Sequence, residues 1–155
     1  MIKFGGESER DPGHSSDFYD LVEIARDEYE RSGRRIDFIS SCSKDVLLIW
    51  WVEMLISGGG VDLYLNDAAS SFNDDFVRLC EKIGALKTAA LFGQLSNLFP
   101  ADRFPLSLDQ RRQLVAKFWD EEDDKWGKYQ DGFYGELIQA EESLGSLYLI
   151  FLRNE

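Results

Sequence analysis

The sequence predicts an all-α fold, a single compact multi-helix domain with a buried central apolar helix. Apolar residues recur every three or four positions along most of the chain, and glycine, proline and capping residues divide these periodic stretches. No stretch keeps the period-two alternation of a half-buried strand for more than a few residues. A chain of 155 residues suits one domain with a substantial core. We expect residues 1–14 to form a mobile lead-in and residues 15–155 the helical domain.

The first helix is expected over residues 17–32. Ser15 or Ser16 suits the N-cap, and Gly33 follows the end of the stretch. The apolar face consists of Phe18, Leu21, Val22, Ala25 and Tyr29. Their spacing is typical of an amphipathic helix.

A second helix is expected over residues 45–56, with Ser43 as its cap. Apolar residues occupy nearly every side of this stretch, which indicates a helix in the middle of the fold. A buried strand is the alternative, but about twelve residues is long for a strand. Three glycines, 58–60, then supply a stop, and residues 61–65 form a short helix or turn.

The rest of the chain divides at recognisable caps and breakers. These are the cap Asn73, the stop Gly84, the breaker Pro100 and the capping box Ser107-x-x-Gln110. The helices expected in this part of the chain cover residues 73–83, 86–99, 107–119, 133–142 and 144–152.

Charge narrows the class of partner. Seventeen Lys and Arg against 29 Asp and Glu give a net charge of −12, which disfavours direct binding to nucleic acid or an anionic membrane and favours a basic protein. Solubility alone is the simpler explanation of such a charge.

Cys42 and Cys80 form no metal or redox motif and are expected to be small buried hydrophobes. With no secretory h-region and no apolar run approaching the ~18 residues of a membrane helix, we expect a cytoplasmic protein, monomeric or homodimeric.

Catalysis has little support in the sequence, and we predict no enzyme activity, cofactor or metal. His14 is the only histidine and belongs to the lead-in. The triple glycine lacks the lysine and Ser/Thr of a phosphate-binding loop. We expect the tryptophans to pack in the core; they are Trp50, Trp51, Trp119 and Trp126.

A calcium-binding loop starting at Asp120 is also disfavoured. Glu122, Asp124 and Asp131 would follow at positions 3, 5 and 12, but Lys125 stands where the loop requires glycine.

Two groups of carboxylates are candidates for a partner surface. On the first helix, four acids fall within one arc opposite the apolar face: Asp20, Glu23, Asp27 and Glu30. Their spacing places a carboxylate about every 5 Å along the axis, on the order of the phosphate spacing along one DNA strand. A solvated helix face is the alternative.

The second group lies in residues 120–142, where nine acids and two lysines give a net charge of −7. Glu121 with Lys125 and Asp124 with Lys128 are i, i+4 pairs that neutralise part of it. The candidate partner-binding acids here are Asp120, Glu121, Glu122, Asp123 and Asp124. Such a run of like charge is costly without a partner, although loops tolerate it.

The stretch around the glycines carries a motif, E-x-x-x-x-x-G-G-x-D-x-Y-x-N, formed by Glu53, Gly59, Gly60, Asp62, Tyr64 and Asn66. It resembles the signature of the bacterial DNA-mimic protein family, small acidic helical proteins. Ser57, Gly58 and Val61 depart from the usual family text. The resemblance covers roughly residues 44–152.

The resemblance implies a protein that presents carboxylates in place of phosphates and occupies the basic DNA-binding surface of a transcription regulator or similar protein. The motif itself is interpreted as structural. An immunity protein that neutralises a cognate, possibly nuclease, toxin is the alternative function.

Overall fold

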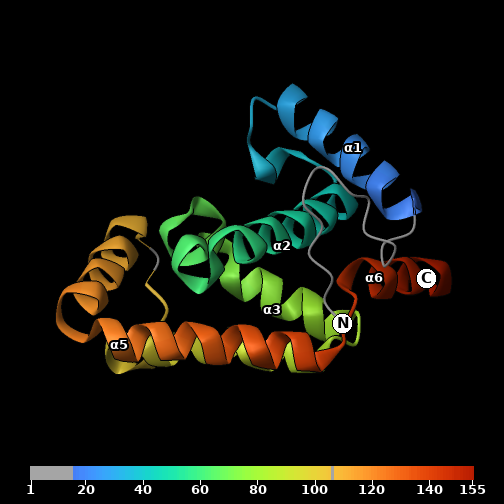
Figure 1. Ribbon diagram of the computed structural model, residues 1–155. Coiled ribbons are helices and arrows are strands. Elements are labelled where there is room, and N and C mark those ends of the chain that lie inside the picture. Colours follow the sequence, from blue (N-terminus) through green and yellow to red (C-terminus); the bar gives the residue numbers. More distant parts are fainter. Residues whose placement is uncertain (1–15, 106) are drawn as a thin grey trace.

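The computed structural model describes residues 16–105 and 107–155, and within them every regular element is helical, which confirms the all-α prediction. The helices are α1 Ser16–Arg31, α2 Ser41–Asn66, α3 Asn73–Lys82, α4 Leu86–Gly93, α5 Leu108–Ala140 and α6 Leu144–Asn154. Short 3₁₀ turns lie at Ile36–Phe38, Ala68–Phe72, Gln94–Leu98 and Pro100–Asp102. α2 runs through the middle, with α1 above it and α3 and α5 below it (Figure 1). The expected lead-in, residues 1–14, and His14 lie outside the described residues.

The first helix is confirmed. Phe18, Val22 and Ala25 are buried on one face of α1. The helix ends at Arg31. Gly33, two residues later, has a left-handed φ of 73°, and Arg34 N donates to Tyr29 O across the end. This bond and the one from Gly33 N to Glu30 O form a Schellman motif, which satisfies two terminal carbonyls.

The central apolar helix is confirmed, but its cap is Ser40 and not Ser43. Ser40 has extended backbone angles, and its side chain accepts a hydrogen bond from Ser43 N. Ser43 is buried, and its hydroxyl donates instead to the carboxylate of Glu28 on α1. α2 therefore begins four residues earlier than residue 45.

The glycines interrupt α2 rather than end it. Gly60 has φ 68° and ψ −158°, a combination open almost only to glycine. Gly59 has an extended φ, but a Cβ there would lie 2.7 Å from Leu63 Cβ. Helical geometry resumes at once and continues to Asn66. Residues 61–65, expected to be a short helix or a turn, are therefore helical.

α2 is also long and apolar enough, by length and composition, to cross a membrane, so the expectation of no such run is wrong. The core helix of a folded domain passes the same test. Val46, Ile49 and Val52 are among the α2 residues with at most 2% exposure, which is the burial expected of a core helix.

The core is organised around Phe92 of α4. Its ring makes edge contacts with Tyr64 of α2, Phe76 of α3 and Phe133 of α5, at centroid distances of 5.4, 4.8 and 5.3 Å. Asn73 lies inside this cluster and is no N-cap: it accepts from Tyr64 Oη at 2.9 Å and donates to Phe92 O at 3.2 Å. The Asn73 side chain points inward because the buried hydroxyl of Tyr64 requires a hydrogen-bond partner.

Two further boundaries differ from expectation. The stretch 86–99 is α4 followed by a 3₁₀ turn, because the α-helix ends at Gly93. Ser107 caps α5 as predicted, accepting from Gln110 N, but α5 continues past Trp119 to Ala140. It is bent at Glu122, where φ −143° and ψ 41° leave the helical region.

The expectation that all tryptophans pack in the core is wrong for Trp119. Trp126 is buried and Trp50 and Trp51 are partly buried, whereas Trp119 is 47% exposed. Of the cysteines, Cys80 is buried as expected and Cys42 is only partly buried; both are free.

Candidate functional site

The carboxylates of Asp20, Glu23, Asp27 and Glu30, called the α1 stripe below, are all exposed. The helix that carries them is fixed by its opposite face, where Phe18, Val22 and Ala25 are buried among the core residues. Asp20, Glu23 and Asp27 form no side-chain ion pair with any residue in the described ranges. The stripe is thus a row of solvent-facing negative charges on a supported helix.

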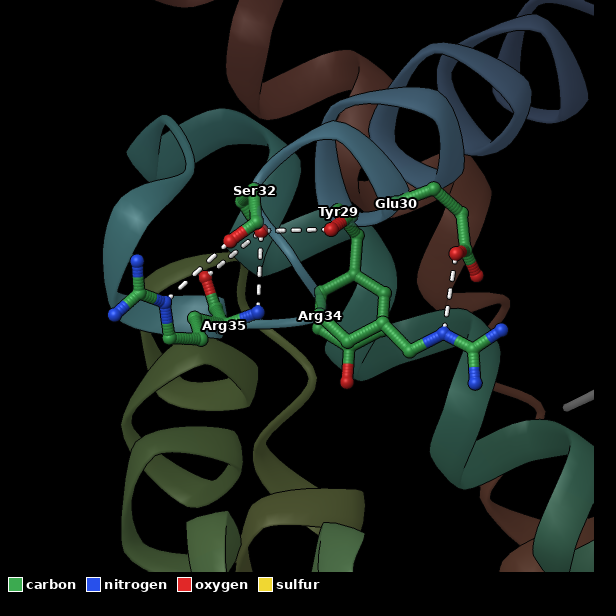
Figure 2. Close-up of polar contacts among 5 residues, drawn as sticks. All are labelled: Tyr29, Glu30, Ser32, Arg34 and Arg35. Carbon is green, nitrogen blue, oxygen red and sulfur yellow. Dashed lines mark hydrogen bonds and ion pairs between the residues drawn. The ribbon is translucent and has the colours of Figure 1, made fainter.

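Glu30 differs from the other three acids of the stripe. Its Oε2 accepts from Arg34 Nε at 3.1 Å, and Figure 2 shows the two side chains facing each other at the end of α1. Ser32 bridges the following turn by donating to Tyr29 O at 2.6 Å and accepting from Arg35 N at 3.1 Å. The stripe therefore runs into a basic end that holds Arg31, Arg34 and Arg35.

Two other carboxylates accept hydrogen bonds at the start of a helix. Glu28 accepts from Ser40 N, Ser40 Oγ and Ser43 Oγ at the start of α2. These bonds, with that from Ser43 first, lower the pKa of Glu28. Glu142 accepts from Lys87 N at 3.0 Å and from Thr88 N and Thr88 Oγ1 at 2.8 and 2.7 Å, at the start of α4. Glu28 thus satisfies one backbone N–H and Glu142 two, and each carboxylate lies at the positive end of a helix dipole.

The second group of acids, residues 120–124, is called the α5 corner, because it surrounds the bend at Glu122. All five side chains are exposed. The ion pairs are Lys117–Glu121 at 3.9 Å and Lys125–Glu122 at 3.4 Å, and not the predicted pairs of Glu121 with Lys125 and Asp124 with Lys128. The bend lies between Glu121 and Lys125 and interrupts their i, i+4 spacing, whereas Asp124 and Lys128 both follow it, and nothing in the structure explains why they do not pair.

The motif residue Asp62 holds this corner in place. Its Oδ1 accepts from Trp119 Nε1 at 2.8 Å and from Trp126 Nε1 at 3.3 Å. Its backbone N–H donates to Gln130 Oε1 at 3.2 Å. Because the two tryptophans precede and follow residues 120–124, one carboxylate of α2 fixes both sides of the bend in α5.

The other motif residues have structural roles in α2. Tyr64 is fully buried and bonded to Asn73, and burial raises the pKa of its hydroxyl far above the usual range. Asn66 Nδ2 donates to Asp62 O at 2.9 Å, and Asn66 O accepts from Arg112 Nε at 3.1 Å. Glu53 is buried in the same helix at 7% exposure. The motif therefore joins α2 to α3 and α5.

The structure keeps the two acidic surfaces apart. Figure 1 places α1 at one end of the molecule and the bend of α5 at the other. Trp119, half-exposed beside the α5 corner, is a candidate contact residue, although its sequence context predicts a core position. Tryptophan is enriched in protein interfaces and among the residues that contribute most to binding. The feature that distinguishes Trp119 from a core tryptophan is its hydrogen bond to Asp62, a residue distant in sequence.

Neither metal nor calcium binding is favoured by the geometry. The segment 120–131 lies within α5 and is helical on both sides of the bend, whereas a calcium loop wraps its ligands around one point. In the described part of the chain, no group of three or more His, Cys, Asp or Glu is placed to hold a metal ion.

Comparison with known proteins finds one family. The profile described as DMP19-like protein matches residues 37–154, about three quarters of the chain. The match includes α2 to α6 and the α5 corner, and it begins after α1. No curated protein and no solved structure matches the chain significantly.

Proposed function

This chain belongs to the DMP19-like protein family, a family of DNA mimics, and we propose that it occupies the basic nucleic-acid-binding surface of a partner such as a transcription regulator. We place this activity in the cytoplasm and assign it to a monomer or homodimer. The family is not a known enzyme family, which supports binding rather than catalysis.

The observation that carries the proposal is the α1 stripe. Asp20, Glu23 and Asp27 present three exposed carboxylates on one side of a helix, without ion pairs to described residues. Spacings of three and four residues place these charges about 5 Å apart along the axis. A cationic groove that binds a phosphate backbone is complementary to such a row.

The helix supplies rigidity as well as charge. α1 is fixed to α2 by its buried face and by the bonds from Ser40 and Ser43 to Glu28. A rigid charged row loses little conformational freedom on binding. Electrostatic attraction then accelerates encounter with a basic partner, and salt weakens it.

The α5 corner is the second candidate contact. It carries five exposed acids, but lysines pair with Glu121 and Glu122, and the bend prevents a straight row of charges. Its half-exposed Trp119 would add apolar contact area. We therefore assign the phosphate-like role to the α1 stripe and test the corner separately.

A pull-down from native cytosol at low and high salt tests the proposal. The expected result is a basic nucleic-acid-binding protein that is retained at low salt, released at high salt and displaced by its own DNA. The matched control is a chain with Asp20→Asn, Glu23→Gln and Asp27→Asn, which keeps shape and polarity but retains less of this protein.

Two results would contradict the DNA-mimic function. A partner that binds DNA and this chain at the same time does not have its nucleic-acid surface occupied. Retention of a toxin that this chain inactivates, particularly one encoded beside it, would instead establish the immunity function.

A further inference from the structure

A groove lies between residues 99–105 and the first turns of α5, and none of its lining residues belongs to the motif or the α1 stripe. Its volume is about 460 Å³, within the range of small-molecule sites. The lining residues are Phe99, Pro100, Arg103, Phe104, Pro105, Gln110, Gln113, Leu114 and Lys117. The last four follow the i, i+3, i+4, i+7 spacing of one helix face, so α5 forms one wall and the loop the other.

Buried contacts hold the loop wall in position. Arg111 is fully buried, and its guanidinium donates to Pro105 O at 2.6 Å and to Ser70 Oγ at 2.8 Å. The same guanidinium lies over the Phe104 ring at 5.6 Å, and Phe104 makes an edge contact with Phe99 at 5.1 Å. The groove is therefore largely preformed, which lowers the conformational cost of binding a ligand.

The charge of the groove is opposite to that of the chain. The chain carries −12, yet no carboxylate is among the lining residues in the described ranges, and two cations, Arg103 and Lys117, are. The Lys117 side chain is 62% exposed, and its ion pair with Glu121 is long, with 3.9 Å between Nζ and Oε2. Gln110 and Gln113 add amide groups. The apolar wall is formed by Phe99, Phe104 and Leu114.

The backbone before Arg103 is strained. Ala101 and Asp102 are consecutive non-glycine residues with φ of 57° and 51°. Left-handed backbone is unfavourable for residues other than glycine and is found preferentially at active sites and ligand-binding segments. Here they turn the chain back so that Phe99 and Phe104 meet on either side of the turn.

We propose that this groove binds a small ligand with an apolar, ring-sized body and one carboxylate. The body packs on Phe99, Phe104 and Leu114, and the carboxylate faces Arg103 and Lys117. The charge complementarity favours an anion, and a preformed groove with aromatic and aliphatic side chains on both walls favours a small molecule. This inference is independent of DNA mimicry.

The test uses the full chain with two probes of the same shape, 3-phenylpropanoate and 3-phenylpropanamide. Titration is followed by ¹H–¹⁵N chemical-shift changes. We expect the carboxylate to bind with a dissociation constant on the order of 1 mM, with shifts confined to residues 99–105 and 110–117. The amide should bind about fivefold more weakly or worse, because it lacks the charge.

Two variants, Arg103→Gln and Lys117→Gln, should each weaken carboxylate binding about two- to fivefold and leave amide binding unchanged. Lys125→Gln is the control, because Lys125 also pairs with a glutamate of α5 but lies outside the groove. Melting curves establish that all three variants fold.

Three results would overturn the proposal. The first is no saturable shift at the groove with the carboxylate. The second is equal affinity for the two probes. The third is the absence of probe binding while Arg103→Gln weakens capture of a protein partner, because the groove would then be a protein-docking surface.

Discussion

The carboxylate of Asp62 accepts a hydrogen bond from the indole of Trp119 at 2.8 Å, although 57 positions separate the two residues. The same oxygen accepts from Trp126 at 3.3 Å. The bond connects the glycine-interrupted helix α2 to the bend of α5. The motif residue Asp62 thus acts as a structural residue and at the same time positions the acidic residues 120–124.

Replacing Asp62 with alanine should destabilise the fold and loosen the α5 corner. Two indole donors lose a shared carboxylate, and Trp126 is buried, so the expected loss is about 1–3 kcal/mol in the free energy of unfolding. Urea denaturation measures the loss, and tryptophan fluorescence reports the changed environment of the indoles. Asp131→Ala, at an exposed acid of α5, is the control and should change stability by less than about 0.5 kcal/mol. Equal stability of the two variants would show that the bond contributes nothing.

The glycines of α2 should differ in their tolerance of a side chain. Gly60→Val should cost about 1–3 kcal/mol, because its positive φ and extended ψ exclude a β-branched residue. Gly59→Val should also cost more than about 1 kcal/mol, because the new Cβ meets Leu63 Cβ.

Gly58→Ala is the control for both glycine variants, because its Cβ would make only an ordinary contact at 3.5 Å. It should be neutral or slightly stabilising, since alanine is the better helix former. Thermal melting of the three variants distinguishes these cases. Unchanged melting of Gly60→Val would show that the break does not require glycine.

The hydrogen bonds that Glu28 accepts at the start of α2 should make stability depend on acid pH. Its hydrogen bonds with Ser43 and Ser40 lower its pKa below the ordinary value of 4.5 in the folded state. A carboxyl with a lowered folded pKa stabilises the fold above its unfolded pKa, and this contribution is lost as the pH falls through the folded pKa. Melting temperature should therefore decline on acidification.

Glu28→Gln should lower the melting temperature at neutral pH and flatten this acid decline. Glu23→Gln, on the same helix but without hydrogen bonds to described residues, should leave the decline as it is. The role of Glu28 would be refuted by parallel curves for the wild type and Glu28→Gln across the acid range.

Local signals were sufficient to predict much of this fold. The bounds of α1 follow from the spacing of Phe18, Val22 and Ala25 and from Gly33, all of which act within a few turns. The helix break at the glycines and the cap at Ser107 are likewise local. The exposed acids of the α1 stripe follow from the same helical period, because they lie opposite its apolar face.

Long-range contacts explain what the sequence did not predict. Asn73 reads as a cap, but the buried hydroxyl of Tyr64 draws its side chain inward. Ser43 also resembles a cap in the sequence, but its hydroxyl donates to Glu28 on another helix. Trp119 resembles a core residue until its partner Asp62 is known. The continuity of α5 through its acidic run also depends on the anchors on either side, Trp119 and Trp126.

The two acidic surfaces should contribute differently to partner binding. Once a partner is known, neutralising Asp20, Glu23 and Asp27 with the matching amides should weaken binding by about 0.2–1 kcal/mol per charge. The loss should lie mainly in the association rate, because these groups act at a distance before contact, and the salt dependence should become shallower. The matched variant neutralises residues 120–124 in the same way and should have the smaller effect on the association rate. Association kinetics at two salt concentrations decide between them. A larger effect of the α5 variant would mean that the α5 corner, and not the α1 stripe, has the phosphate-like role. Association rates unaffected by either variant would mean that both acidic surfaces are only solvated faces, and the basis for DNA mimicry in this chain would be lost.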